Sequence, residues 1–162
     1  MKNHDFPGKL LITGSVSGAP YQEKMKKVCD AAVEQAGLKD RVIFTGFITE
    51  KELDQLLRHA AVFVYPSLYE GFGIPILEAM KVGTPVVTSS VTAMPEVAGD
   101  AALIVDPYDT DKMAEAMDRV IKDEKLRAEL REKGFERAKP YSWEATCSTY
   151  YKVYEELAAR GI

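Results

Sequence analysis

The sequence has 162 residues, a length that fits one ordinary domain with a buried core. Apolar residues make up 46% of the chain, and its net charge of −4 comes with no basic stripe, so we expect no nucleic-acid partner. The two cysteines, Cys29 and Cys147, form no disulfide framework, which favours a reduced, cytoplasmic setting.

The first residues contain no apolar stretch of the kind found in signal peptides. No apolar run approaches the roughly 18–20 residues of a membrane-spanning helix. A peripheral contact with a membrane stays open.

Short apolar runs bounded by glycine or proline alternate with longer stretches of helical pattern. Such runs are typical of buried parallel strands, and we predict strands at residues 9–13, 41–44, 61–65, 85–88 and 102–105. We predict helices at residues 21–36, 50–59, 75–81, 110–122, 124–138 and 143–159, with a short turn at 94–98. This alternation predicts an α/β fold, a Rossmann-like parallel sheet with helices on both faces. With no internal repeat and no long linker, residues 1–162 are predicted to be a single domain, with C-terminal helices at about 124–160.

Three predicted strand ends are rich in glycine or small polar residues. They are residues 14–18, 45–47 and 66–73. Ligands of parallel α/β sheets bind beyond the carboxyl ends of the strands. We therefore expect these three segments to lie side by side along one rim.

The third of these segments leads into a predicted helix. Gly71 and Gly73 let the backbone approach a ligand closely. Pro75 is expected to open the helix, with free N–H groups from about Gly73 to Ile76 that point outward. A helix N-terminus of this kind attracts phosphate.

Two carboxylates flank the same segment. Glu70 lies in the loop and Glu78 lies one turn into the helix, where each could hold two hydroxyls of a sugar. On spacing alone, an ordinary glycine loop followed by a first-turn glutamate explains the pattern equally well.

The order of motifs along the chain resembles the C-terminal domain of GT-B retaining glycosyltransferases of family four, the glycosyl transferases group 1. The matching pieces are KLLITGSVSG, RVIFTGF, VFVYPSLYEGFGIPILEAMKVGTPVVTS and MPEVAGDAALIVDP, in family order and with family spacing. Glu70 and Glu78 reproduce the family's two glutamates separated by seven residues.

The resemblance implies a donor site for a nucleotide sugar linked through UDP, GDP or ADP, with no metal and no cofactor. Glu78 matches the residue that binds the ribose hydroxyls. Glu70 matches the catalytic position that faces the transferred sugar, where it orients the sugar rather than acting as a nucleophile. The other implied donor contacts are Gly14, Ser15, Thr45, Gly46, Phe47, Gly71, Phe72, Gly73 and Ile74.

The family's domain begins with a strand and helix that carry two basic residues, which clamp the donor diphosphate. We find no match for this first strand and helix in the sequence. Its place is central in the family's sheet, so we expect an open slot, closed by its neighbours or filled by another chain, for example in a homo-oligomer.

The family's N-terminal acceptor-binding domain has no match either. We therefore expect the chain alone to be weakly active or inactive in transferring a hexose to its acceptor. The alternative is a non-catalytic module that binds a nucleotide or nucleotide sugar, or a half-enzyme that needs a separate acceptor domain.

Overall fold

The computed structural model describes residues 8–14 and 19–161. Its contacts divide the chain into two compact units, Met1–Leu56 and Leu57–Ile162. The predicted single domain over the whole chain stays a prediction.

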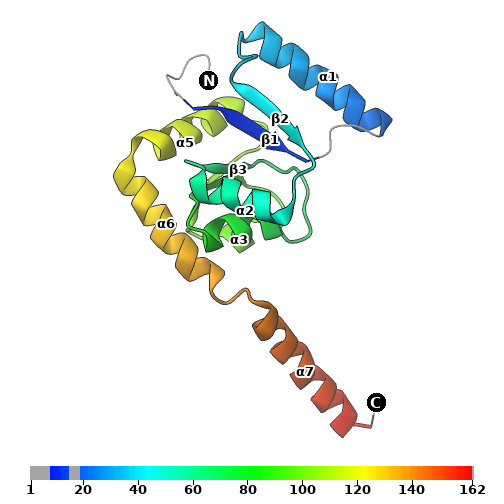
Figure 1. The fold of residues 1–162 in the computed structure, drawn as a ribbon. Coiled ribbons are helices and arrows are strands. Elements are labelled where there is room, and N and C mark those ends of the chain that lie inside the picture. Colours follow the sequence, from blue (N-terminus) through cyan, green and yellow to red (C-terminus); the bar gives the residue numbers. More distant parts are fainter. Residues whose placement is uncertain (1–7, 15–18, 162) are drawn as a thin grey trace. The chain divides into compact units, whose positions relative to one another are not determined.

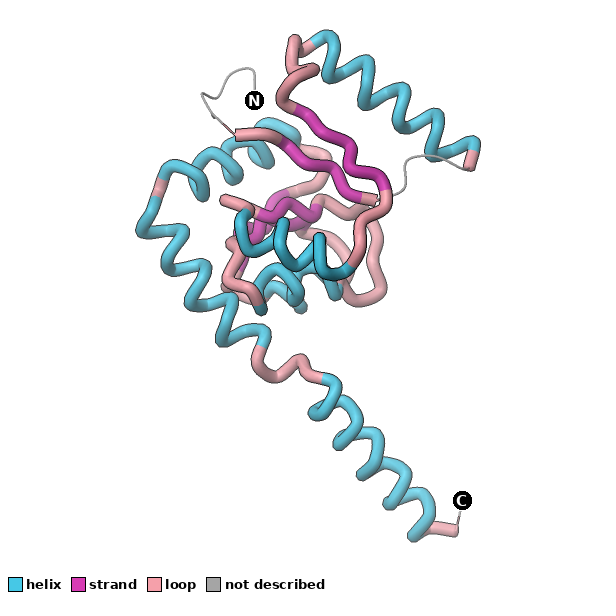
Figure 2. Tube along the Cα trace, in the orientation of Figure 1, coloured by secondary structure: helices cyan, strands magenta, loops and turns pink. Residues whose placement is uncertain are grey.

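The first unit is built on two parallel strands. Strand β1, Leu10–Thr13, pairs with β2, Val42–Gly46, and helix α1, Pro20–Gln35, connects them (Figures 1 and 2). The ammonium group of Lys26 on α1 lies 5.0 Å from the centre of the Phe44 ring on β2. A cation over an aromatic face in this way adds an attraction between helix and strand.

Helix α2, Glu50–His59, follows β2 and crosses the boundary between the units. Its start is a capping box. The Thr49 N–H donates to Oε2 of Glu52 at 2.8 Å, and the Glu52 N–H donates to Oγ1 of Thr49 at 3.3 Å. Both partners satisfy backbone donors that the first turn would otherwise leave unpaired.

The second unit contains a three-stranded parallel sheet in the order β3-β4-β5. Its strands are β3 Phe63–Tyr65, β4 Val86–Ser89 and β5 Ala102–Val105. Its helices are α3 Ile74–Lys81, α4 Met94–Ala98, α5 Thr110–Lys122, α6 Glu124–Ala138 and α7 Trp143–Ala159. Helices α3 and α4 pack on β4, α5 packs on β4 and β5, and α6 packs on α3 and α5.

The core of this unit lies around its central strand. All four residues of β4 are buried, so both faces of the strand are covered. Val87 packs with Val120 of α5 and Leu130 of α6, and all three side chains are almost fully buried. Burying a side chain of this size stabilises a fold by about 1.5–3 kcal/mol.

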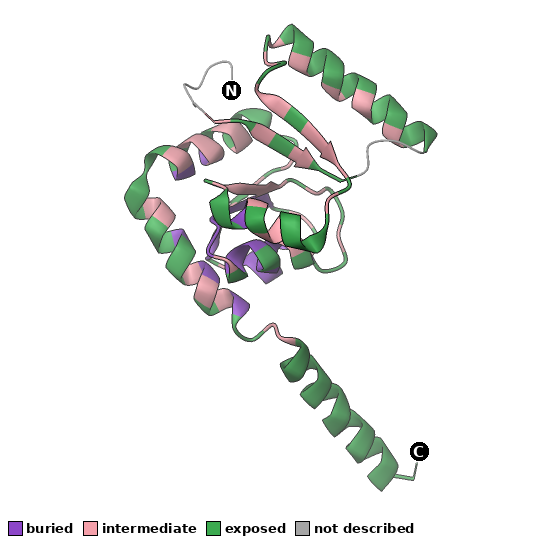
Figure 3. Ribbon diagram, in the orientation of Figure 1, coloured by how far each residue is buried: buried purple, intermediate pink, exposed green. Residues whose placement is uncertain are grey.

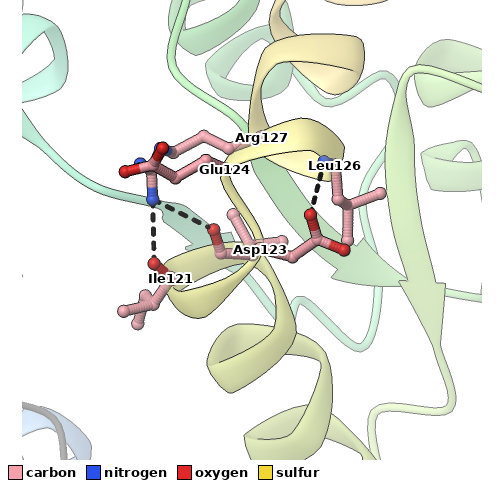
Figure 4. Close-up of polar contacts among 6 residues, drawn as sticks. Ile121, Asp123, Glu124, Leu126 and Arg127 are labelled. Carbon is pink, nitrogen blue, oxygen red and sulfur yellow. Dashed lines mark hydrogen bonds and ion pairs between the residues drawn. The ribbon is translucent and has the colours of Figure 1, made fainter.

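Asp123 both ends α5 and begins α6. Its carboxylate accepts a hydrogen bond from the Leu126 N–H at 2.9 Å, and Arg127 reaches back to the Ile121 carbonyl oxygen at 2.8 Å (Figure 4). The Asp123 cap pairs an N–H group at the start of α6, and the Arg127 contact pairs a carbonyl oxygen at the end of α5. This fixes the corner between the two helices that cover the sheet.

Every residue of α7 is exposed (Figure 3). Aromatic side chains on it include Trp143, Tyr150, Tyr151 and Tyr154. Within residues 8–14 and 19–161, no helix is both long and apolar enough to cross a membrane.

The α/β class and the parallel pairing are confirmed. The five strands occur where the sequence predicts them, with ends that differ by one or two residues, and they form two sheets, each flanked by helices. What fills the expected central slot stays a prediction.

Candidate functional site

The loop of residues 66–73 leaves the carboxyl end of β3 and enters α3 (Figure 1). Two buried hydroxyls of β4 hold its start. Thr88 Oγ1 donates to the carbonyl oxygen of Tyr65 at 2.9 Å, and Ser89 Oγ donates to that of Ser67 at 2.6 Å. The central strand of the sheet therefore sets where this loop begins.

Glu70 is held at both its backbone and its side chain. The phenol of Tyr65 donates to Oε1 of Glu70 at 2.7 Å, and the Ser67 hydroxyl donates to the same oxygen at 3.0 Å. The backbone N–H of Glu70 donates to Oγ1 of Thr92 at 3.3 Å. Residues from β3 and the loop hold the carboxylate of Glu70, and the segment after β4 holds its backbone.

The charges of the site also affect the pKa of Tyr65. Burial, the hydrogen bond to Glu70, and the negative charges of Glu70 and Glu78 raise the pKa of Tyr65 to about 12, from an ordinary 10.0. The phenol therefore stays protonated at neutral pH and remains a hydrogen-bond donor.

Gly73 is the N-cap of α3 and has a φ of 99°. A Cβ at this position would lie 2.7 Å from Cε of Met94, a buried side chain of α4. Only glycine fits both the backbone conformation and the space. The close approach packs the start of α3 against α4.

The helix start differs from the prediction in two details. Helix α3 begins at Ile74, one residue before Pro75, and the Ile76 N–H is not free because it donates to the Gly73 carbonyl oxygen at 3.0 Å. This tight first turn was not visible in the sequence. In the described part of the chain, the N–H groups of residues 71–74 donate to no acceptor.

The other side of the loop rests on an aromatic contact. The rings of Phe72 and Tyr141 meet edge to face with centres 5.9 Å apart. The guanidinium of Arg137 lies 5.4 Å from the Tyr141 ring and donates to the carbonyl oxygens of Glu96 and Val97 at the end of α4. Phe72 is thereby connected to α4 and α6.

The two carboxylates differ in their surroundings. Glu70 is half-buried and hydrogen-bonded, whereas Glu78 is exposed on α3. A loop with free N–H groups between two carboxylates can bind an anion through the backbone and hydroxyls through the acids.

The predicted residues of the first unit gather at the ends of β1 and β2. The Gly14 N–H donates to the Gly46 carbonyl oxygen at 3.0 Å, and the Thr45 hydroxyl donates to the same oxygen at 3.0 Å. Phe47 is 85% exposed. Ser15 lies outside the described residues.

Sequence reasoning did not single out Tyr65, Ser67 or Thr92. In the sequence, Tyr65 and Ser67 have the pattern of a strand end and the loop residue after it. They lie five and three residues before Glu70, and in the structure their side chains reach it. Thr92 gave no signal, because a contact across 22 residues has no local pattern.

Two shallow hollows on the second unit lie elsewhere, along α6. Their linings share Glu132 and Glu136, and neither includes a residue of the loop before α3. No group of three or more His, Cys, Asp or Glu side chains that could hold a metal ion occurs among residues 8–14 and 19–161.

Known proteins match most of this chain. The family model of the glycosyl transferases group 1 matches residues 3–137. The O-antigen chain mannosyltransferase B of Escherichia coli is 43% identical over 125 residues, which cover 77% of this chain and 33% of that protein. The chain therefore spans about a third of the length of that relative.

Solved structures match the fold. Sucrose-phosphate synthase from Thermosynechococcus elongatus is 32% identical with a TM-score of 0.82, over 94% of this chain and 39% of that one. Anabaena HepE, solved in complex with UDP and glucose, has a TM-score of 0.83 over 98% of this chain and 42% of that one. At 19% identity, HepE supports the fold alone.

Proposed function

Because this chain belongs to the family of glycosyl transferases group 1, we propose that residues 70–78 bind the nucleotide-sugar donor of a retaining glycosyltransferase. The activity of the whole enzyme is part of the proposal, since the chain spans about a third of the length of the mannosyltransferase that it resembles.

One observation carries the proposal. The N–H groups of residues 71–74 have no acceptor in the described part of the chain, and they lie between Glu70 and Glu78. A row of free backbone donors at a helix start suits a diphosphate, because it adds to the positive end of the helix dipole. Carboxylates on either side suit neutral hydroxyl groups rather than further phosphate.

The two glutamates take different roles in this proposal. Glu78, exposed on α3, accepts hydrogen bonds from the ribose hydroxyls. Glu70, fixed by Tyr65 and Ser67, faces the sugar that is transferred and orients it. Residues 71–74 bind the diphosphate between the two sugars.

The family resemblance also implies donor contacts for residues of the first unit. Gly14, Thr45 and Gly46 are joined by hydrogen bonds at the ends of their strands, and Phe47 is exposed beside them. An exposed aromatic ring is a suitable stacking surface for a base. Ser15 keeps the role that the family resemblance implies.

The proposed reaction replaces one bond at the anomeric carbon by another on the same face of the sugar. The acceptor hydroxyl forms the new bond, the bond to the diphosphate breaks, and the proton of the hydroxyl goes to the leaving diphosphate. Catalysis then rests on positioning the reactants and on stabilising the negative charge that develops on the diphosphate. The free N–H groups supply this stabilisation. The family resemblance implies no metal or cofactor in this step.

The donor is proposed to be a hexose linked to UDP, GDP or ADP. A mannosyl donor comes first, since the E. coli relative is a mannosyltransferase. Transfer is proposed to need an acceptor-binding part beyond this chain, in a cytoplasmic enzyme. Without that part, the same site makes the chain a nucleotide-sugar-binding module.

A thermal-shift screen against UDP, GDP, ADP and their hexose conjugates tests the proposal. A ligand at 100 times its dissociation constant adds about 2.7 kcal/mol to the free energy of unfolding, which raises the melting temperature by roughly 5–10 °C. We expect such a shift with one nucleotide series. No shift with any of them would contradict the proposal, and binding without transfer, with an acceptor present, would favour the module.

A further inference from the structure

The two oxygens of Glu70 are not equivalent. Tyr65 and Ser67 both donate to Oε1, at 2.7 and 3.0 Å, whereas no residue in the described part of the chain donates to Oε2. A carboxylate oxygen has two lone pairs for hydrogen bonds, so these two donors fill Oε1.

We propose that Tyr65 and Ser67 are positioning residues that occupy Oε1 of Glu70 and leave Oε2 alone to receive a hydroxyl of the transferred sugar. The inference rests on the proposed function, in which Glu70 faces that sugar. It also changes the expectation that Glu70 uses both carboxylate oxygens to hold two hydroxyls. Only one oxygen, Oε2, accepts a hydrogen bond from the donor sugar.

The supports of Tyr65 and Ser67 are themselves fixed. Their carbonyl oxygens accept hydrogen bonds from Thr88 and Ser89, whose side chains are fully buried in the central strand. The Tyr65 ring stacks on Phe63, with centres 5.9 Å apart. The two donors therefore come from rigid positions, which is what orientation of a substrate group requires.

The hydrogen-bond donors are also suited to the task. Tyr65 keeps its proton at neutral pH because burial and the neighbouring carboxylates raise its pKa to about 12. The Ser67 hydroxyl lies 3.0 Å from Oε1 and 3.5 Å from the Tyr69 carbonyl oxygen, so the carboxylate is the closer and stronger acceptor.

Two single variants test the proposal by binding. Dissociation constants of the whole chain are measured for UDP-glucose and GDP-mannose and for UDP and GDP alone. We expect Tyr65→Phe and Ser67→Ala to weaken binding of the preferred nucleotide sugar about tenfold while its bare nucleotide changes less than about twofold. Tyr69→Phe is the matched control, because it removes an 82% exposed phenol from the same loop, and it should change neither constant.

A second variant separates positioning from structure. In Glu70→Gln, the amide oxygen should stay on Tyr65 and Ser67, which turns the NH₂ group toward the sugar. With both donors removed in Tyr65→Phe plus Ser67→Ala, the amide can rotate and offer its oxygen instead. Glu70→Gln should therefore weaken sugar binding less in that double variant than in the unmodified protein.

The outcomes are distinct. Equal weakening of nucleotide and nucleotide sugar by Tyr65→Phe and Ser67→Ala, or fold-losses that simply multiply when Glu70→Gln is added, would overturn the positioning role and leave the proposed function standing. If the unmodified chain binds none of UDP, GDP, ADP and their hexose conjugates, the proposed function fails, and this inference fails with it.

Discussion

The backbone N–H of Glu70 donates to Oγ1 of Thr92, a residue 22 positions later in the chain. Thr92 is the one non-glycine residue with a positive φ, 54°, among residues 8–14 and 19–161. A β-branched residue is crowded in this conformation. The contact therefore connects the candidate site to a residue whose backbone conformation is unfavourable for its side chain.

Variants at Thr92 should separate the hydrogen bond from the crowding. Thr92→Ser keeps the oxygen and removes the branch, so the free energy of unfolding should stay equal or rise. Thr92→Val keeps the branch and loses the oxygen, so it should be about 1 kcal/mol less stable than the unmodified protein. Chemical unfolding of both variants and of the unmodified protein measures the two effects, and a Thr92→Val variant as stable as the unmodified protein would show that the hydrogen bond contributes nothing.

Tyr65 should make the protein sensitive to alkali. Its pKa is about 12 in the folded chain and 10.0 ordinarily, so below pH 10 both folded and unfolded states are protonated and its contribution is complete. As the pH rises from 10 to 12 only the unfolded state loses its proton, and the contribution is lost. We expect a loss of about 1–2 kcal/mol, because solvent screens a half-exposed group.

The measurement is the free energy of unfolding at pH 8, 10 and 12 for the unmodified protein and for Tyr65→Phe. The Phe variant should lack this part of the decline, whereas Tyr69→Phe should keep it. Parallel curves for the unmodified protein and Tyr65→Phe would contradict the raised pKa.

Gly73 should not tolerate a side chain. Gly73→Ala places a Cβ 2.7 Å from Met94 Cε and requires a φ of 99°, which together should cost about 2–3 kcal/mol of stability. Gly71→Ala is the matched control, because a Cβ there meets nothing within 4 Å. Thermal unfolding measures the stability of both variants. An equal loss of stability in Gly73→Ala and Gly71→Ala would refute the special geometry of Gly73.

Gly46 offers a simpler test of backbone conformation in the first unit. Its φ is 68°, and a Cβ would have open space around it. Gly46→Ala should therefore cost about 1 kcal/mol from conformation alone. Gly46→Asn should cost less, because asparagine tolerates the left-handed region. The reverse order of stabilities would point to a side-chain clash instead.

Local patterns were predicted well from the sequence. The spacing of Thr49 and Glu52 is typical of a capping box, and both of its hydrogen bonds are present. Glycine and proline predict the loop before α3 to within one residue of its end. These features depend on neighbours in the chain, so their residue types are sufficient evidence.

Contacts between distant residues were not predictable. Thr92 reaches Glu70 only because β4 brings the segment after it beside the loop, and Thr88 and Ser89 hold that loop across 23 and 22 residues. The hydroxyls of Thr88 and Ser89 gave no sign that they would bond carbonyls rather than solvent. The use of one Glu70 oxygen by Tyr65 and Ser67 likewise follows from three-dimensional packing.

The central claim is that the segment with Glu70 and Glu78 binds a nucleotide sugar, and titration calorimetry of Glu78→Gln tests it most directly. Loss of a charged acceptor for ribose hydroxyls should weaken binding of both the nucleotide and the nucleotide sugar by about 10–100-fold. Glu115→Gln, on the exposed side of α5, is the matched control and should leave binding unchanged. Unchanged affinity of Glu78→Gln for a ligand that the unmodified chain binds would contradict the account.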